Sequence, residues 1–243
     1  FSRISPWRKV DYLDRSKGER MSGASNDPTQ DTAQTATHGV GATVRVIACG
    51  MIAREVLAIN KQLGHEHIDL KCLPADFHHH PDRIAPAADK AIREAREEGF
   101  EHIFVGYADC GTGGALDRVC AEHGVSRIEG PHCFSFYYGN QAFEAASDEM
   151  MMTFFITDFL ARHYETFLVA PLGLDRHPEL REMYFGNYER ALYLAQTDDP
   201  ELTARAREAA DVIGLPFERR LTGYGDLTPF LDKAGDAAKR QLP

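Results

Sequence analysis

The chain has 243 residues and a formal net charge of −10 when histidines are counted as neutral. This acidic balance argues against nucleic acid or an anionic membrane surface as a partner, because both require a basic protein surface. The longest apolar runs, such as residues 153–156, are far too short to span a bilayer, and no continuous apolar core of a secretory signal precedes them, so we expect a cytoplasmic protein.

Residues 1–43 differ in composition from the rest of the chain. They are polar, contain many helix- and strand-breaking residues, and show no apolar periodicity of either kind. Such a segment cannot bury enough apolar surface to fold alone, so we expect a disordered or extended tail. Residues 44–243 suit a single domain with a sizeable core.

Two strand–helix units are predicted at the start of this domain. A β-branched run over residues 44–48 indicates a strand that ends just before Gly50, and apolar residues at helical spacing indicate a helix over residues 52–63. Residues 68–73 alternate and predict a second strand, which a charged amphipathic helix over residues 83–98 follows.

The same alternation continues in the middle of the chain. Residues 102–107 predict a buried strand, residues 116–123 a helix, and residues 126–129 a short strand. The aromatic-rich region over residues 134–188 is predicted to be mostly helical and to form an insertion of several short helices that covers the site.

A last β-α-β unit is predicted from residues 191–195, 201–213 and 217–221, with Asp199 and Pro200 at the start of its helix. Strands that alternate with helices of this length indicate a parallel sheet. The sequence therefore predicts an α/β fold with an open, Rossmann-like parallel sheet, helices on both faces and one helical insertion.

Three of the five cysteines come directly after predicted strands. Cys49, Cys110 and Cys133 follow three different strands, whose carboxyl ends open on the same edge of a parallel sheet, where ligands bind. A helix N-terminus favours a thiolate, and two of these cysteines are followed by glycine and a helix start. Cys72 and Cys120 are predicted to be core residues.

Three cysteines at one edge are typical of a metal site with one further or open position. A zinc ion could take Cys49, Cys110 and Cys133 together with His132 or water. A 4Fe-4S cluster could take the same three thiolates and leave one iron free for substrate, and we favour the cluster because all three protein ligands are cysteines. Alternatively, these thiols pack as small apolar side chains where strands meet loops.

Polar side chains beside these cysteines are candidates for catalysis. His132 precedes Cys133, and Asp109 precedes Cys110, where it could act as a general base, orient a ligand or cap the next helix. The histidine run over residues 78–80 lies in the loop after the second strand, at the same edge. It could reach the site or remain solvated.

Glycines surround the same loops. Gly50, Gly111, Gly113 and Gly114 would let the backbone approach a cofactor or cluster closely. A glycine-rich turn between strand and helix can also cradle a phosphate group, which would make the protein a nucleotide-dependent transferase. However, the stretch lacks the spacing of a dinucleotide fingerprint and the Gly-Lys-Ser/Thr ending of a P-loop.

Several of these motifs resemble a family of prokaryotic domains of unknown function. The resemblance covers about residues 44–231, and it rests on Ala48-Cys49-Gly50, His132-Cys133 and residues 106–114, 157–160 and 184–188. Members of that family are often encoded near corrinoid proteins and trimethylamine-methyltransferase-like proteins. The resemblance therefore implies a role in corrinoid-linked methyl or one-carbon metabolism, and it implies no catalytic residues beyond the cysteine motifs.

The leading hypothesis from the sequence is a metal-dependent enzyme, a transferase or lyase, that acts on a small molecule in one-carbon metabolism. A corrinoid protein is a candidate partner, and a homo-oligomer is compatible with the sequence. The alternative is an accessory protein that holds or delivers a corrinoid or a metal and catalyses nothing. A substrate pocket beside the cysteines would distinguish the enzyme from the accessory protein.

Overall fold

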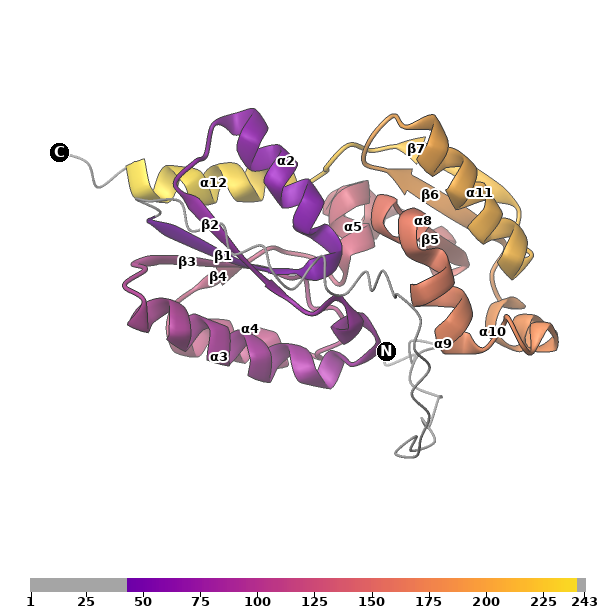
Figure 1. Ribbon diagram of the computed structural model, residues 1–243, viewed down its shortest axis with the longest axis horizontal. Coiled ribbons are helices and arrows are strands. Elements are labelled where there is room, and N and C mark those ends of the chain that lie inside the picture. Colours follow the sequence, from indigo (N-terminus) through magenta and orange to yellow (C-terminus); the bar gives the residue numbers. More distant parts are fainter. Residues whose placement is uncertain (1–42, 240–243) are drawn as a thin grey trace, which may run out of the picture.

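The computed structural model describes residues 43–239, and the first part of this range forms a four-stranded parallel sheet. The strands lie in the order β2-β1-β3-β4 (Figure 1). Their bounds are β1 (Val44–Cys49), β2 (Ile68–Leu73), β3 (His102–Gly106) and β4 (Ser126–Arg127). The tail predicted over residues 1–43 lies outside the described residues except for Thr43.

Helices cover both faces of this sheet, with α2 and α12 on one side and α3 and α4 on the other (Figure 1). Helices α2 and α4 end where Gly64 and Gly124 take left-handed φ angles of 68° and 61°, which glycine adopts without a steric cost. The predicted α/β class with an open, helix-covered parallel sheet is confirmed. The helix bounds are α2 (Ala53–Leu63), α3 (Ile84–Glu97), α4 (Ala115–His123) and α12 (Leu227–Lys239).

The last three strands form a second parallel sheet, in the order β5-β6-β7, instead of extending the first sheet. Its first strand lies inside the region that the sequence predicted as helical. All five residues of that strand are buried, so its apolar run carries no alternation that would distinguish a strand from a buried helix. The strand bounds are β5 (Thr153–Thr157), β6 (Arg190–Ala195) and β7 (Phe217–Leu221).

Short helices otherwise fill the region between the two sheets, as the sequence predicted. Helix α11 (Pro200–Ile213) begins at the expected residue, because the Asp199 carboxylate accepts hydrogen bonds from the backbone N–H groups of Glu201 and Leu202 at 2.8 and 3.2 Å. The remaining elements are η2 (Gly50–Ile52), η3 (Ala75–His79), η4 (Pro81–Arg83), α5 (Cys133–Tyr138), α6 (Asn140–Ala145), α7 (Ser147–Met151), α8 (Asp158–Tyr164), η5 (Glu165–Val169), α9 (Ala170–Leu172), η6 (Pro178–Leu180) and α10 (Arg181–Phe185).

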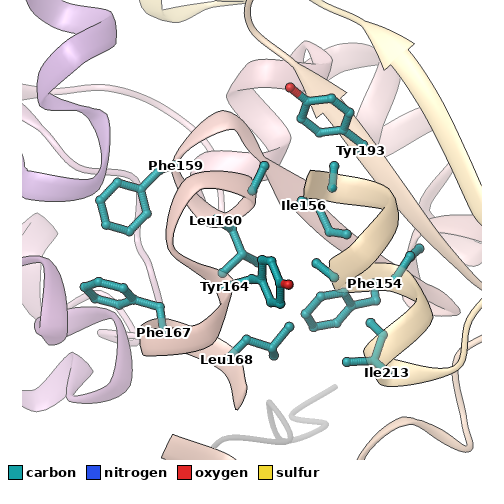
Figure 2. Packing of buried hydrophobic residues seen from close by; sticks show 14 of the residues in the cluster. Phe154, Ile156, Phe159, Leu160, Tyr164, Phe167, Leu168, Tyr193 and Ile213 are labelled. Carbon is teal, nitrogen blue, oxygen red and sulfur yellow. The ribbon is translucent and has the colours of Figure 1, made fainter. Parts of the chain in front are cut away.

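The second sheet buries a different set of side chains on each face. Phe154, Ile156 and Tyr193 face the core formed with α8 and α11 (Figure 2). The alternate residues Phe155 and Leu192 pack into another cluster, because successive side chains of a strand point to opposite faces. Both faces of the second sheet are therefore covered.

This second cluster joins the two sheets. It contains Val46 of β1, Leu192 of β6, Phe136 of α5 and Leu231 of α12, all at most 5% exposed. Helix α5 lies between the two sheets (Figure 1). The carboxyl edge of the first sheet therefore meets the second sheet across a common apolar core.

Among residues 43–239, none of the helices has the length and apolar character needed to cross a membrane.

Candidate functional site

Three cysteines lie at the carboxyl edge of the first sheet. Strand β3 pairs in parallel with both β1 and β4, so the three strands end on the same side of the sheet. Cys49 is the last residue of β1, Cys110 lies in the turn after β3, and Cys133 is the first residue of α5, soon after β4. The topology therefore brings together three residues that are far apart in the sequence.

The loops that carry Cys110 and Cys133 are joined through their backbones. The backbone N–H of Cys110 donates to the carbonyl oxygen of Pro131 at 2.8 Å, and that of Asp109 donates to Gly130 at 3.0 Å. The backbone N–H of Cys133 is directed at the sulfur of Cys110. These contacts hold two of the three candidate ligands side by side.

Burial governs the protonation of the three thiols. It raises the pKa of Cys49, Cys110 and Cys133, that of Cys110 to about 12. For Cys110 and Cys133, the charge of a neighbouring cysteine raises the pKa further. The backbone N–H groups at the helix starts act to lower the pKa of Cys49 and Cys133, as expected, but desolvation of the thiolate outweighs them.

In the part of the chain that the structure describes, the three thiols do not converge as the ligands of one metal ion do. Within residues 43–239, no three side chains of His, Cys, Asp or Glu are placed to hold one metal ion. A zinc ion with sulfur ligands at about 2.3 Å would bring the sulfurs to roughly 3.8 Å from one another. The thiols of Cys49, Cys110 and Cys133 are thus close enough to affect one another's pKa without this convergence.

The two other cysteines differ from each other. Cys120 is 5% exposed and packs with Leu116 in the core under α4, as the sequence predicted. Cys72 is only partly buried, and its pKa is raised to about 12 by burial and then by the charge of Cys49. Cys72 therefore lies near the candidate site, which the sequence did not predict.

Cys110 has an unusual backbone conformation. Its φ angle is +47°, and among residues 43–239 it is the only non-glycine residue with a positive φ. A residue with a Cβ atom pays a steric cost of about 1–2 kcal/mol in this left-handed region. The strained residue is the middle one of the three cysteines in the sequence. Strained backbone conformations cluster at functional sites, so this conformation supports a functional role for Cys110.

Two histidines lie against this site. His132 is mostly buried between the rings of Phe134 and Phe143, with ring centroids 5.4 and 5.2 Å away, and its Nδ1 atom has no hydrogen-bond partner within residues 43–239. Burial lowers the pKa of both His132 and His78 to about 4, and in His78 the neighbouring histidines, His132 included, add to this effect. One residue of the predicted histidine run therefore reaches the site.

The Tyr107 hydroxyl points toward the same place. Tyr107 is 2% exposed, and its oxygen has no nitrogen or oxygen partner in the described part of the chain. It lies against the Cys49 sulfur, and burial followed by the charge of Cys49 raises the pKa of the phenol. The Cys49 sulfur is therefore the hydrogen-bond partner of this buried hydroxyl, and Tyr107 is placed to orient that thiol.

Asp109 is occupied by the loop that follows it. Its carboxylate accepts hydrogen bonds from the Thr112 hydroxyl and the Gly114 N–H at 2.8 Å each, and from the Gly113 N–H at 3.3 Å. These contacts match the capping alternative better than a general base. They also direct the N–H groups of Gly113 and Gly114 at the Asp109 carboxylate, so these two groups are not available to bind a phosphate group.

The candidate glycines serve the packing of these loops. A Cβ atom on Gly50 would lie 3.0 Å from the carbonyl oxygen of Leu73, so only glycine fits between the ends of β1 and β2. Gly111 has a φ of +83° and lies against Pro81. A hollow of about 790 Å³ opens on the outer side of this turn and is lined by charged residues that include Arg93 and Arg118.

A second polar cluster lies at the carboxyl edge of the second sheet. Asp158 is fully buried and accepts hydrogen bonds from the Tyr193 hydroxyl at 2.7 Å, the Thr197 hydroxyl at 2.6 Å, and the backbone N–H groups of Gln196 and Thr197 at 3.0 and 3.1 Å. In Figure 2 the Tyr193 hydroxyl points away from the labelled apolar side chains. Asp158 was assigned no role from the sequence, although an aspartate directly after a buried strand was an available signal.

Glu55 and Arg162 complete this second cluster. Arg162 Nη2 lies 3.7 Å from Asp158 Oδ2, and Arg162 Nη1 lies 3.8 Å from Glu55 Oε1. Glu55 is 4% exposed, and burial raises its pKa to about 7, although its own backbone N–H and Arg162 act in the opposite direction. The sequence did not identify Glu55. A glutamate in the first turn of a helix is usually exposed to solvent, where its negative charge interacts favourably with the helix dipole.

The two polar clusters are continuous through one tyrosine. Tyr137 of α5 is 2% exposed, and its pKa is raised by burial and then by the charges of Glu55, Cys133, Asp158 and Cys49. Its hydroxyl is therefore within electrostatic reach of the thiols and of the acidic cluster. The thiols, the two histidines and the acidic cluster belong to one buried region between the two sheets.

Comparison with known proteins identifies a family without a known activity. A family model described as a protein of unknown function, DUF1638, matches residues 72–231. No curated protein and no solved structure matches the chain. The matched range includes Cys110 and Cys133, and it contains both sheets apart from β1 and most of β2.

Proposed function

The chain belongs to the DUF1638 family of proteins of unknown function, and from its own residues we propose that it binds a metal centre through Cys49, Cys110 and Cys133. The observation that carries this proposal is the meeting of three cysteine-bearing loops at one sheet edge, with the Cys133 N–H directed at the Cys110 sulfur. Two further observations support it, namely the left-handed φ of Cys110 and the buried hydroxyl of Tyr107 against the Cys49 sulfur.

An iron–sulfur cluster suits these thiols better than a zinc ion. Each cysteine of a 4Fe-4S cluster binds a different iron, so its sulfurs are more widely spaced than those around one ion. All three proposed protein ligands are cysteines, as they are in such a cluster. With three protein ligands, the fourth iron would be open to a substrate atom.

We propose that this centre serves an enzyme rather than a metal carrier. Tyr107 places a buried hydroxyl beside the thiols, the buried His132 Nδ1 atom has no partner within residues 43–239, and Glu55 lies within electrostatic reach of Cys49. A carrier needs only the ligands, whereas these additional groups could bind and orient a small molecule at the open position. The chemistry of the centre, when bound, would be that of a Lewis acid or an electron donor.

The proposed setting is corrinoid-linked one-carbon metabolism in the cytoplasm, with a transferase or lyase reaction and a corrinoid protein as a partner. The resemblance of the cysteine motifs to their family supports the metabolic setting. All five cysteines are free thiols, which is usual for a protein kept in a reducing compartment.

The proposal is tested on protein that is purified without oxygen. We expect a brown sample with broad absorption near 400 nm and about four irons per chain. Replacing Cys110 with serine should remove most of the iron, because a hydroxyl is a much poorer ligand for soft metals than a thiolate.

Cys120→Ser is the matched control, since Cys120 lies in the core under α4. It should reduce stability by about 1–3 kcal/mol through burial of a hydroxyl and leave the iron content unchanged. Equal loss of iron in both variants would mean that unfolding explains the result. A colourless wild-type protein with no iron or zinc would overturn the proposal.

A further inference from the structure

Two buried polar atoms face each other across the boundary between the two sheets. Glu55 lies in the first turn of α2, which covers the first sheet, and Arg162 lies in α8, which follows the first strand of the second sheet. Glu55 Oε2 and Arg162 Nη1 are buried and have no hydrogen-bond partner within residues 43–239. The 3.8 Å between Arg162 Nη1 and Glu55 Oε1 is too long for a hydrogen bond.

The arginine lies between two carboxyl groups. Its Nη2 atom forms an ion pair with Asp158 at 3.7 Å, which is also too long for a hydrogen bond, and four hydrogen bonds from Tyr193, Gln196 and Thr197 hold that carboxylate in place. Arg162 therefore presents one nitrogen to Asp158 and the other to Glu55. A buried N–H group without a hydrogen bond destabilises the folded state, so a protein retains this arrangement where a ligand completes it.

The surroundings of Glu55 favour its uncharged form near neutral pH. Burial raises its pKa to about 7, with Asp158 acting in the same direction and Arg162 and Arg54 in the opposite one. The other titratable groups in electrostatic contact with Glu55 are Cys49, Tyr137 and Tyr224. A protonated Glu55 donates a hydrogen bond, and so does Arg162, so together the pair offers two donors and one positive charge.

We propose that Glu55 and Arg162 form a subsite that binds a carboxylate group of the substrate and places the rest of that molecule against the thiols. A carboxylate oxygen could accept from Arg162 Nη1 and from Glu55 at the same time. The subsite deepens the proposed function, because it names the substrate class as a small carboxylic acid, and it depends on that function only for the role of the thiols.

The charge of the subsite favours a singly charged group over a doubly charged one. Asp158 already offsets the positive charge of Arg162, so these two groups and a protonated Glu55 are neutral together, and the two charges of a phosphate ester would be left less compensated than the single charge of a carboxylate. The planar guanidinium group also matches the geometry of a carboxylate. Phosphate is therefore the discriminating competitor.

Acetate is the probe, and its binding to the full chain is measured by saturation-transfer NMR, with acetamide as the uncharged analogue of equal shape. We expect acetate to bind more tightly at about pH 6 than at about pH 8, because ionised Glu55 repels it above its pKa. Acetamide and phosphate should compete weakly. Arg162→Met should weaken acetate binding roughly 10–100-fold, which is the range for loss of a charge-assisted hydrogen bond.

Arg176→Met is the matched control, since Arg176 is 55% exposed and forms its ion pair within residues 43–239 with its neighbour Asp175. It should leave acetate binding unchanged. Glu55→Gln keeps a hydrogen-bond donor without a titrating group, so this variant should bind acetate equally at both pH values. It also keeps the proposal testable if Arg162→Met fails to fold around the buried Asp158.

The result that overturns the inference is acetate binding that neither Arg162→Met nor the change of pH alters. Iron content, measured on the same samples, separates the two proposals. Iron in all of these proteins with no dependence on Arg162 would refute the subsite alone. Acetate binding that depends on Arg162 in a protein without metal would support the subsite and refute the metal centre.

Discussion

The protonation of Glu55 also affects the stability of the fold. Its pKa of about 7 in the folded chain lies above its ordinary value of 4.5, so the folded state holds this proton more tightly than the unfolded state. Stability from this group is fully present below about pH 4.5 and is lost as the pH rises through 7. A difference of about 2.5 pKa units corresponds to at most ~3 kcal/mol.

We therefore expect Glu55→Gln to gain stability relative to the wild type as the pH rises from about 5 to about 8, up to the same ~3 kcal/mol. Urea unfolding at both pH values measures the difference. The exposed residue Glu122 provides the control, since Glu122→Gln should show the same offset from wild type at both pH values. A Glu55→Gln offset that is independent of pH would contradict the assigned burial of this carboxyl group.

At the residue scale, the sequence predicted the strand-end positions of Cys49, Cys110 and Cys133 and the core position of Cys120, but it did not predict that Cys72 lies near the site. The position after a strand was sufficient to bring Cys49, Cys110 and Cys133 to one edge, because topology alone decides it. Their raised pKa values depend on how deeply the loops are buried, which local patterns do not contain. The role of Asp109 likewise depended on the direction of the N–H groups in the next turn.

At the scale of elements, helix α5 is held in place by the loop before α12. The Asp226 N–H donates to the carbonyl oxygen of Phe136 at 2.8 Å, and the Asp226 carboxylate accepts from the Asn140 N–H at 2.7 Å. Gly225 makes this approach possible, since a Cβ atom there would lie 2.1 Å from the Phe136 carbonyl oxygen. The position of Cys133, at the start of α5, therefore depends on a glycine ninety residues away.

A pair of glycines tests this contact. Gly225→Ala and Gly223→Ala both place a Cβ atom at a positive φ, of +49° and +60°, but only the first meets a neighbouring backbone. Gly223→Ala should cost about 1–2 kcal/mol for its φ angle. Gly225→Ala should cost about 1–3 kcal/mol more, because α5 must move away. Thermal unfolding of the two variants gives the comparison. Equal losses of stability would mean that α5 can shift away from the new Cβ atom at no cost in free energy.

The bounds of elements whose apolar residues recur with a clear period were predicted to within one or two residues, whereas β5 was not predicted. Helices α2 and α11 carry both an apolar periodicity and end signals at Gly64 and Gly214. Strand β5 is buried on both faces, so its sequence has no alternation, and short helices surround it. Its partner β6 lies more than thirty residues later, and that pairing has no local signature.

At the scale of the whole molecule, the shared core should make unfolding a single event. Side chains of β1, α5, β6 and α12 pack in one cluster, so neither sheet can lose its partner and keep its core. We expect one coincident urea transition by circular dichroism and by tyrosine fluorescence. Two separate transitions would show that the sheets are independent units.

Replacing one residue of this cluster should weaken both sheets together. Leu192→Ala in β6, at a side chain 5% exposed, should cost about 2–5 kcal/mol and speed amide exchange in β1 as well as in β6. Leu221→Ala at the end of β7 is the control, because Leu221 is 54% exposed and should have little effect. Faster exchange confined to the second sheet would contradict a common core.

The division into two sheets had no signal in the sequence. Both sheets are parallel and follow the same alternation of strands and helices, so the order of elements fits one sheet of seven strands as well as it fits two sheets. The difference arises from the short helices around α5, which carry the chain away from the edge at β4. The packing of these short helices between the sheets therefore determines that β5 starts a second sheet.

The left-handed conformation of Cys110 restricts how this position can change in evolution. Glycine would relieve the strain at φ +47° and lies a single nucleotide change away from the common cysteine codons, so selection for stability alone would drive the residue toward glycine. A cysteine is therefore retained at position 110 only while its sulfur contributes to fitness. Descendants of this chain that have lost the function should therefore reveal themselves first by a glycine at position 110.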